Sequence, residues 1–488
     1  MSVTSPPRPP QPRASPRITE GWILEERPLR HPDHSSRQVM ARRGWWLVGM
    51  NFLIPGSAQI LAGSRKLGRF GLGSTLLLWV LVILTGLCAL LWQPLLFTLA
   101  TNWFVLLLAQ ALLIGYAALW AFLAVDTIRL VRLVKVGPAA KVGIAGLAVV
   151  LTVLASGTAA YGAQITGVVR DTLGSIFGAS AASVPPSDGY YNILLLGADS
   201  GEGRDSMRYD SISVVSVNAT SGSVTITGIP RDMVHAPFAD GSPMQELYPD
   251  GFQGKSSSSC GWGSGINQLT NAVQNCRDDE GAGLYPDAET NGSTPAIEAT
   301  KDAAEGMLGI SIPYYVFIDM DGFASLVDAL GGVDMNVTER LPEGGGPAYE
   351  GQPAEDWATG WIEVGQQHMD GDTAQWYARS RYTTSDWDRM KRQRELQTAI
   401  LSQFTPTNVL TRFQDVAAAG RDLLQTDLPQ SLLPFLSDLA LKAKEQPVTT
   451  IELTPEHGVD PDRPDYAYVH EMVADSLHPP TATPAPAG

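Results

Sequence analysis

Aspartate and arginine residues recur at the ends of three short apolar runs in this chain. The runs are Asn192–Leu196, Ser211–Val217 and Ser223–Ile229, and each is bounded by Gly, Asp or Asn, as buried strands are. The charged residues at their ends are Asp199, Arg208, Asp210, Arg231 and Asp232. Charges at the ends of buried strands are typical of a site at the edge of a sheet. The alternative for each Arg–Asp pair is an ordinary ion pair.

A second group of arginines lies far downstream, in the segment Ala378–Gln393 of an otherwise acidic region. On the helix predicted there, Arg389 and Gln393 are four residues apart and share one face. A guanidinium fork binds two phosphate oxygens at once and stays charged, so the two groups together predict a diphosphate pocket. Its candidate residues are Arg208, Arg231, Arg379, Arg381, Arg389 and Gln393, and Arg392 lies close beside the last two.

Asp199 and Asp210 have a different predicted role in this pocket. Carboxylates repel phosphate, but they bind a hard divalent ion that phosphate also ligates. The two residues therefore predict a Mg²⁺ (or Mn²⁺) ion bridged to a diphosphate. The alternative is that they only balance the charges of Arg204 and Arg208.

The two parts of the 488-residue chain differ in charge. Up to Arg170 there are 16 basic and 5 acidic residues, whereas the remainder holds 18 basic and 45 acidic residues. Such asymmetry suggests opposite faces of a membrane. The acidic part would repel nucleic-acid phosphates, so no nucleic-acid partner is expected.

Three uncharged apolar stretches, at about residues 70–92, 96–125 and 142–164, are long enough to span a membrane as helices. Residues 45–63 are also apolar, but Pro55-Gly56 interrupts them, which favours a re-entrant segment. Residues 1–44, rich in Pro, Ser and Arg, are predicted to be a disordered tail.

Lys and Arg residues precede the first span and separate the second from the third, which places these segments in the cytoplasm. We therefore expect a multi-pass protein of the cell membrane with a cytoplasmic N-terminus. Three crossings deliver the chain after about residue 165 to the extracytoplasmic side.

The predicted fold class is α/β: a multi-span helical membrane region followed, after a linker at 166–189, by an extracytoplasmic α–β–α sandwich over 190–455. Glycine- and proline-rich stretches at 239–265 and 341–360 predict loops, and residues 456–488 a C-terminal tail. Further strands are expected at 314–318, 333–337 and 448–453, and helices at 266–276, 296–308, 322–330, 371–377, 387–404, 409–419 and 429–445.

Cys260 and Cys276 lie in the acidic part of the chain, with no neighbouring His to suggest a zinc site. In an oxidising compartment they would form a disulfide, and two free buried thiols are the alternative.

Six blocks follow one another over about residues 190–405: NILLLGADS, RYDSISVVSVN, IPRD, GINQLTNA, YYVFIDMDGFASLVDALGGVDMNV, and RSR followed by DWDRMKRQ. In these blocks the chain resembles the LytR–CpsA–Psr (LCP) family. It departs from the family in its extra membrane segments. Arg204 and Asp205, between Asp199 and Arg208, leave the alignment with the family motif ambiguous by one or two positions.

The resemblance implies an extracytoplasmic, membrane-anchored phosphotransferase with the LCP fold. It would move a glycopolymer from a polyprenyl-diphosphate carrier to peptidoglycan through a phosphodiester, usually at the muramic-acid 6-hydroxyl. Matched residue by residue, it assigns the metal to Asp199 and Asp210 and the diphosphate to the six pocket residues. Arg231 would stabilise developing charge, with Asp232 or Asp386 as general base.

The lipid tail of such a carrier requires an apolar slot. Ile193–Leu196, Val214–Val217 and Leu396–Ile400 offer side chains for it, and plain core packing is the alternative for them.

Two other functions share such a pocket: a pyrophosphatase that releases the polymer phosphate to water, and a non-catalytic envelope sensor or attenuator of anionic polymer. Asp199 and Asp210 favour catalysis, because an anion binder gains nothing from them. The Ala-, Gly- and Pro-rich composition is compatible with a high-GC actinobacterium, where arabinogalactan would be the polymer; teichoic acid or capsular polysaccharide is the alternative.

Overall fold

The structure is a computed structural model, and it describes residues 29–177, 183–198, 208–257, 260–276, 283–344, 346–349, 351–382, 384–403, 412 and 424–479. By its internal contacts the chain forms two units, one of residues 1–87 and 109–164 and the other of residues 88–108 and 165–488. Each unit has a hydrophobic core of its own.

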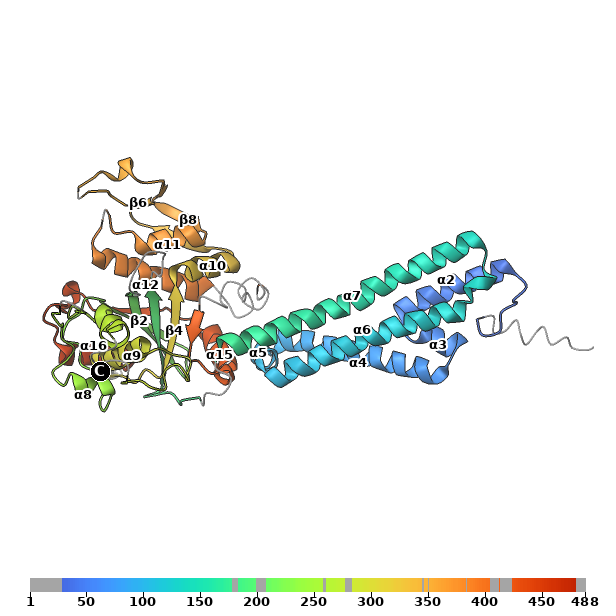
Figure 1. The fold of residues 1–488 in the computed structure, drawn as a ribbon, viewed down its shortest axis with the longest axis horizontal. Coiled ribbons are helices and arrows are strands. Elements are labelled where there is room, and N and C mark those ends of the chain that lie inside the picture. The colour runs from blue at the N-terminus through green and yellow to red at the C-terminus, as the bar shows by residue number, and fades with distance from the viewer. Residues whose placement is uncertain are drawn as a thin grey trace, which may run out of the picture. The chain divides into compact units, whose positions relative to one another are not determined.

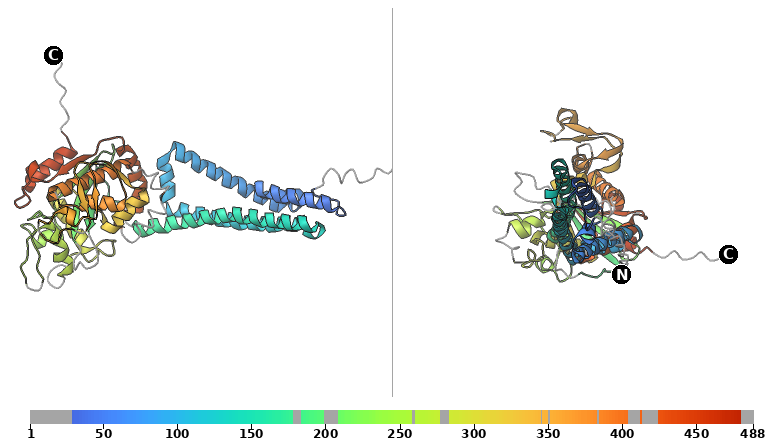
Figure 2. Two further views of the ribbon diagram at one scale, coloured as in Figure 1. Left: turned by 90° about the horizontal axis from the view of Figure 1, so that it is seen from above. Right: turned by 90° about the vertical axis from the view of Figure 1, so that its right-hand side faces the viewer.

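Among the described residues, three helical segments are long and apolar enough to cross a membrane: Arg65–Leu91, Trp103–Lys135 and Pro138–Ile176. They are α4 (Arg65–Leu91), α6 (Trp103–Val131) with the turn η1 (Leu133–Lys135), and α7 (Pro138–Ile176). Figure 2 shows them from two further directions. Their length and composition support a membrane anchor.

Two shorter helices precede them, α2 (Arg37–Leu53) and α3 (Ser57–Ala62), so the interruption expected at Pro55-Gly56 separates two elements. Gly56 between them has a φ of 90°, and a Cβ there would lie 2.5 Å from the backbone oxygen of Gly68. Only glycine permits this close approach to α4.

The predicted disordered tail is wrong from Arg37 onward. The Ser36 side chain caps α2 by accepting from the backbone N–H of Val39. The buried Arg43 guanidinium donates to two backbone carbonyls, those of Leu29 and Leu130, each at 2.7 Å. These contacts fix residues that composition alone assigned to disorder.

Two further boundaries are corrected. The second apolar helix begins at Trp103 rather than near residue 96, because Asn102 leaves helical geometry and separates α6 from α5 (Gln93–Thr101). Helix α7 continues to Ile176 through a stretch without proline, so residues 166–176 are helix and not linker.

A six-stranded sheet forms the centre of the second unit, with the order β10-β3-β2-β1-β4-β9 (Figure 1). Its strands are β1 (Tyr190–Ala198), β2 (Tyr209–Asn218), β3 (Val224–Ile229), β4 (Tyr314–Asp319), β9 (Leu424–Thr426) and β10 (Thr449–Glu452). β2 runs antiparallel to β1 and β3, whereas β4 is parallel to β1. The ends of β1, β3 and β4 therefore meet the start of β2 at one end of the sheet.

Helices cover both faces of this sheet, which confirms the α/β sandwich. Leu194 and Val214 face one core, which α9 (Pro295–Leu308) and α16 (Tyr466–Leu477) complete. Alternate residues such as Ile193 and Val215 face the other side, toward α12 (Asp386–Gln403) and α15 (Leu433–Ala443).

The first core also contains Val469, Val473 and Leu477 of α16, and the Tyr190 hydroxyl donates to the backbone oxygen of Leu477. The prediction of a C-terminal tail is therefore wrong for residues 456–477, which belong to the domain. The rest of the predicted tail lies largely outside the described residues.

A smaller lobe, residues 333–369, stands over α10 (Met320–Leu330) and α11 (Gly371–Arg379) and is called the hairpin lobe below (Figure 1). It pairs β5 (Val333–Val337) with β8 (Gly365–Met369), and β6 (Leu341–Glu343) with β7 (Gly360–Ile362). Strands β6 and β7 and the turn η4 (Ala354–Asp356) lie where a loop was predicted. These elements are too short to carry a periodic signal.

The remaining differences are local. The predicted loop at 239–265 contains the short helix α8 (Pro243–Leu247). The helix predicted at 266–276 is present but irregular, since the 3₁₀ helix η2 (Ile266–Gln268) leads into the π-helix η3 (Asn271–Asn275). The turn η5 (Gln430–Leu432) precedes α15, and η6 (Pro455–His457) follows β10. Of the helix predicted at 409–419, only Arg412 lies within the described residues.

Candidate functional site

Charged side chains gather at the end of the sheet where β2 begins and β3 ends. Arg231 bonds Asp210 of β2 directly. Its Nε lies 3.4 Å from Asp232 Oδ2, and its Nη2 lies 3.9 Å from Asp386 Oδ1 at the start of α12. The antiparallel register of β2 and β3 thus brings together residues that are about twenty positions apart in the chain.

Helix α12 adds a second guanidinium to this group. Arg389 Nη2 lies 3.0 Å from Asp386 Oδ2, one helical turn away, and its Nη1 donates to the backbone oxygen of Asp210 at 3.2 Å. Arg381 Nη1 approaches Asp386 Oδ1 at 3.5 Å. The six residues that form this charge cluster are Asp210, Arg231, Asp232, Arg381, Asp386 and Arg389.

Burial divides the cluster into a closed and an open side. The Arg389 side chain is 5% exposed, whereas those of Arg381 and Asp232 are 55% and 65% exposed. An anion from solvent therefore meets Arg381 and Asp232 first, with Arg389 behind them.

The electrostatic surroundings of the two inner arginines differ. Burial opposes the charged form of Arg231, but Asp210, Asp232 and Asp386 outweigh it and raise the pKa of the guanidinium. For Arg389, burial outweighs the attraction of Asp386, so its pKa is lowered. Both remain cationic near neutrality, because arginine titrates far above that range.

The other predicted residues are distributed around the cluster. Arg208 is exposed and directly precedes β2, and the Arg379 guanidinium at the end of α11 lies 5.5 Å from the centre of the Trp376 ring. Gln393 donates to the backbone oxygen of Ala378 at 3.2 Å. Asp199 lies outside the described residues.

Asn267 is a site residue that sequence reasoning did not single out. Its Nδ2 donates to Asp232 Oδ1 at 2.9 Å and so orients that carboxylate. Gln268 donates in turn to Asn267 Oδ1 at 3.2 Å, and Asn271 to Gln268 Oε1 at 3.1 Å. The segment Asn267–Asn275 held the signal, because five of its nine residues carry amide side chains.

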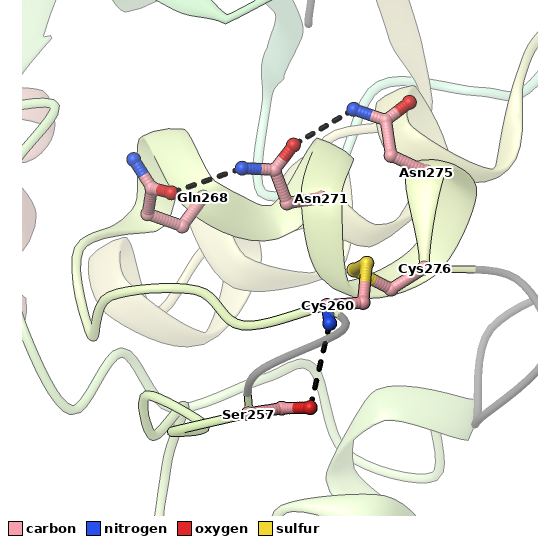
Figure 3. Close-up of a disulfide and its surroundings, with 6 residues drawn as sticks. All are labelled: Ser257, Cys260, Gln268, Asn271, Asn275 and Cys276. Atoms are coloured by element: carbon pink, nitrogen blue, oxygen red, sulfur yellow. Dashed lines mark hydrogen bonds between the residues drawn. A yellow bond between two sulfur atoms is a disulfide. The ribbon is translucent and has the colours of Figure 1, made fainter.

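A disulfide closes the segment that carries these amides. Cys260 and Cys276 are bonded, as predicted, with their Cα atoms 5.7 Å apart. Figure 3 shows the bond beside η3, where the side chains of Gln268, Asn271 and Asn275 form a continuous hydrogen-bonded row. The cross-link restrains the far end of the row that begins at Asp232.

Next to the charge cluster the domain has an apolar cavity of about 460 Å³ that is open to one side. Ser211, which follows Asp210, and Gln393, one turn from Arg389, both line it. Its apolar wall includes Ile193, Leu195, Val215, Val217, Leu396 and Ile400, with Val316, Phe323, Leu436 and Ala440 from neighbouring elements. The segments predicted to offer an apolar slot therefore do line a cavity.

The structure does not test the predicted metal site, because Asp199 lies outside the described residues. Among the described residues no three His, Cys, Asp or Glu side chains group in a way that could hold a metal ion. Asp210 supplies a hard oxygen donor, and Asp386 Oδ1 is buried without a hydrogen-bond donor from the described part of the chain. Carboxylate oxygens of this kind suit Mg²⁺ chemically.

The sequence model of the LytR_cpsA_psr family matches residues 166–478, which is more than half of the chain. The chain belongs to the LytR_cpsA_psr family. The match ends at residue 478, close to the end of α16, in agreement with the placement of this helix in the domain.

Two relatives illustrate the range of names in the LytR_cpsA_psr family. Biofilm regulatory protein A of Streptococcus mutans is 25% identical over 311 residues, which cover 61% of this chain and 66% of the relative. The polyisoprenyl-teichoic acid–peptidoglycan teichoic acid transferase TagU of Halalkalibacterium halodurans is 27% identical over 240 residues, covering 49% and 61%. The chain thus spans less than two thirds of either relative's length.

Among solved structures, the crystal structure of B. subtilis TagV is similar at 19% sequence identity with a TM-score of 0.39. The similarity covers 59% of this chain and 97% of that one.

Proposed function

We propose that this LytR_cpsA_psr family protein transfers a glycopolymer from a polyprenyl-diphosphate carrier to peptidoglycan. The observation that supports this most is the continuity of the charge cluster with the apolar cavity. Asp210 and Ser211 are adjacent in β2, and Arg389 and Gln393 are one turn apart on α12. In each pair the first residue belongs to the charge cluster and the second lines the apolar cavity. A ligand with an anionic head joined to an apolar tail matches this arrangement.

In the proposed reaction an acceptor hydroxyl attacks the phosphorus that carries the glycopolymer. A new P–O bond forms, the bridging P–O bond of the diphosphate breaks, and polyprenyl monophosphate leaves. Arg231 and Arg389 stabilise the charge that develops on the phosphate oxygens. The hydroxyl proton passes to a carboxylate of the cluster.

We assign that proton acceptor to Asp232 rather than Asp386. Asp386 faces three guanidinium groups, those of Arg231, Arg381 and Arg389, at 3.0–3.9 Å, so its oxygens are already engaged in ion pairs. Among the described residues Asp232 has one guanidinium partner, Arg231 at 3.4 Å, and it is the more exposed carboxylate, oriented by Asn267. Asp386 then serves to align the arginines.

A divalent cation completes the proposed site. Three arginines and three aspartates make the cluster formally neutral, so a diphosphate requires further positive charge. We propose that Asp210, with Asp199, holds Mg²⁺ (or Mn²⁺), which supplies charge neutralisation for the leaving phosphate.

The names of the TagU-type relatives point to teichoic acid as their polymer. For this chain, the prediction of arabinogalactan rests on composition and remains untested. We further propose a multi-pass membrane location with the N-terminus in the cytoplasm and the catalytic domain outside.

The test uses the full chain in lipid nanodiscs with a short polyprenyl-diphosphate sugar and a peptidoglycan fragment, assayed with Mg²⁺ and with EDTA. We expect a sugar–phosphate–glycan product that disappears with EDTA. Release of lipid monophosphate without that product would indicate a pyrophosphatase, and tight binding without turnover would indicate a sensor.

A further inference from the structure

We propose that Trp357 and Tyr382 form an aromatic corner that binds a pyranose ring of the acceptor glycan. The inference rests on the proposed transfer reaction and names the acceptor subsite that this reaction needs. Trp357 belongs to the hairpin lobe and follows η4, whereas Tyr382 directly follows Arg381 of the charge cluster.

The two rings make a right-angled pair at the margin of the charge cluster. Their centres are 4.9 Å apart and their planes meet at 80°, so the edge of one ring abuts the face of the other. Both residues are half-buried. A sugar presents apolar C–H faces and polar edges, and the rigid aromatic side chains of Trp and Tyr offer a matching apolar face at little cost in conformational entropy.

A buried donor in the corner lacks an acceptor. The Trp357 indole N–H is buried and makes no hydrogen bond with any described residue. A free indole N–H pairs with an oxygen when one is available. The ring and hydroxyl oxygens of a pyranose are such acceptors, and the buried N–H would reach one if the indole turned outward on binding.

The position of the corner favours the acceptor glycan over the sugar of the donor. The donor is already held at two places, its diphosphate at the charge cluster and its tail in the apolar cavity. The acceptor has no such anchor, although its hydroxyl must reach the open side of the cluster. Tyr382 adjoins Arg381, which lies on that open side and is 55% exposed.

A second tryptophan of the hairpin lobe provides a matched control. Trp361 in β7 has its ring face covered by the Arg340 guanidinium, 3.7 Å from the ring centre. Arg340 is held there by Glu363 at 3.0 Å. Replacing Trp361 removes the same type of side chain from the same lobe, at a ring that already has a guanidinium over one face.

The experiment compares Trp357→Ala, Tyr382→Leu and Trp361→Ala in the full chain in nanodiscs. The acceptor is a synthetic peptidoglycan tetrasaccharide, and the readouts are the KM for acceptor, the KM for donor lipid, and lipid monophosphate release without acceptor. We expect the acceptor KM to rise roughly tenfold in the first two variants, with the other readouts and Trp361→Ala at wild-type values.

An unchanged acceptor KM in Trp357→Ala and Tyr382→Leu would overturn the inference. A rise in the donor KM instead would assign the corner to the donor sugar. An equal rise in the acceptor KM of Trp361→Ala would show that the variants act by disturbing the folding of the lobe. If the wild type makes no transfer product, binding of the tetrasaccharide measured by calorimetry still tests whether the corner binds the glycan. Weaker binding by Trp357→Ala supports the corner, and equal binding rejects it.

Discussion

Arg389 and Arg394 lie five positions apart on α12, and both side chains are almost fully buried, but their surroundings differ. Arg394 has one carboxylate partner, Glu452 of β10, at 2.7 Å, and Gly228 closes over it so tightly that a Cβ there would lie 2.5 Å from the guanidinium carbon. Arg389 shares Asp386 with Arg231 and Arg381 beside an apolar cavity.

The contrast shows what marks a ligand-binding arginine in this domain. Both guanidinium groups keep buried nitrogens without a hydrogen-bond partner among the described residues, so an unpaired nitrogen alone does not mark a site. The difference lies in how easily a ligand from solvent can reach the guanidinium. Arg389 stands behind exposed members of the same cluster, whereas backbone and β10 enclose Arg394.

The largest expected effect is on the transfer rate, and it distinguishes Arg389 from Arg394. Arg389→Ala should lower the transfer rate by roughly 10³-fold or more, because a positioned arginine stabilises phosphoryl-transfer charge to that extent. The thermal unfolding of the variant should stay cooperative, since Asp386 keeps Arg231 and Arg381 as partners. Arg231→Ala should behave in the same way. Measuring both the transfer rate and the thermal unfolding curve of each variant tests this prediction.

A charge-preserving control sharpens that comparison. Arg389→Lys retains the charge but not the planar fork, so we expect partial activity between wild type and alanine. Loss of the cooperative transition in Arg389→Ala would instead mean that the cluster is a structural ion network.

The converse experiment targets Arg394. Arg394→Met leaves Glu452 buried without its partner, which should lower the free energy of unfolding by about 3–5 kcal/mol. Transfer per folded molecule should remain near wild type. The double variant Arg394→Met/Glu452→Gln should recover part of the stability. Lost activity at unchanged stability would move Arg394 into the site.

The comparison also shows what sequence could predict here. The three short apolar runs of β1 to β3 located Asp210, Arg231 and Asp232 at strand ends on an edge of the sheet, and helical spacing aligned Arg389 with Gln393. Local pattern could not separate Arg389 from Arg392 or Arg394. Arg392 donates to the backbone oxygens of Tyr377 and Ser380, contacts that only the tertiary fold creates.

Elements that depend on distant partners were missed for the same reason. Strands β8 and β9 are five and three residues long, and they pair with β5 and β4 from far along the chain. Helix α16 completes a core begun by β1, almost 300 residues earlier. Asn267 becomes a site residue only because Asp232 lies beside it in space.

The smallest expected effect concerns a buried carboxylate outside the charge cluster. Burial, with Glu305 and Glu298 nearby, raises the pKa of Asp302 on α9 from 3.8 to about 6, although Tyr285 hydrogen-bonds it. Between pH 4 and 6 the folded state therefore holds a proton that the unfolded state has lost, so stability falls as pH rises through this window. The loss is on the order of 2–3 kcal/mol.

Asp302→Asn should remove this dependence of stability on pH, measured as the difference in thermal unfolding between variant and wild type from pH 4 to 7. The matched Asp475→Asn, at an exposed position of α16, should retain it. An unchanged slope in Asp302→Asn would show that burial does not hold a proton on this carboxylate in the folded domain.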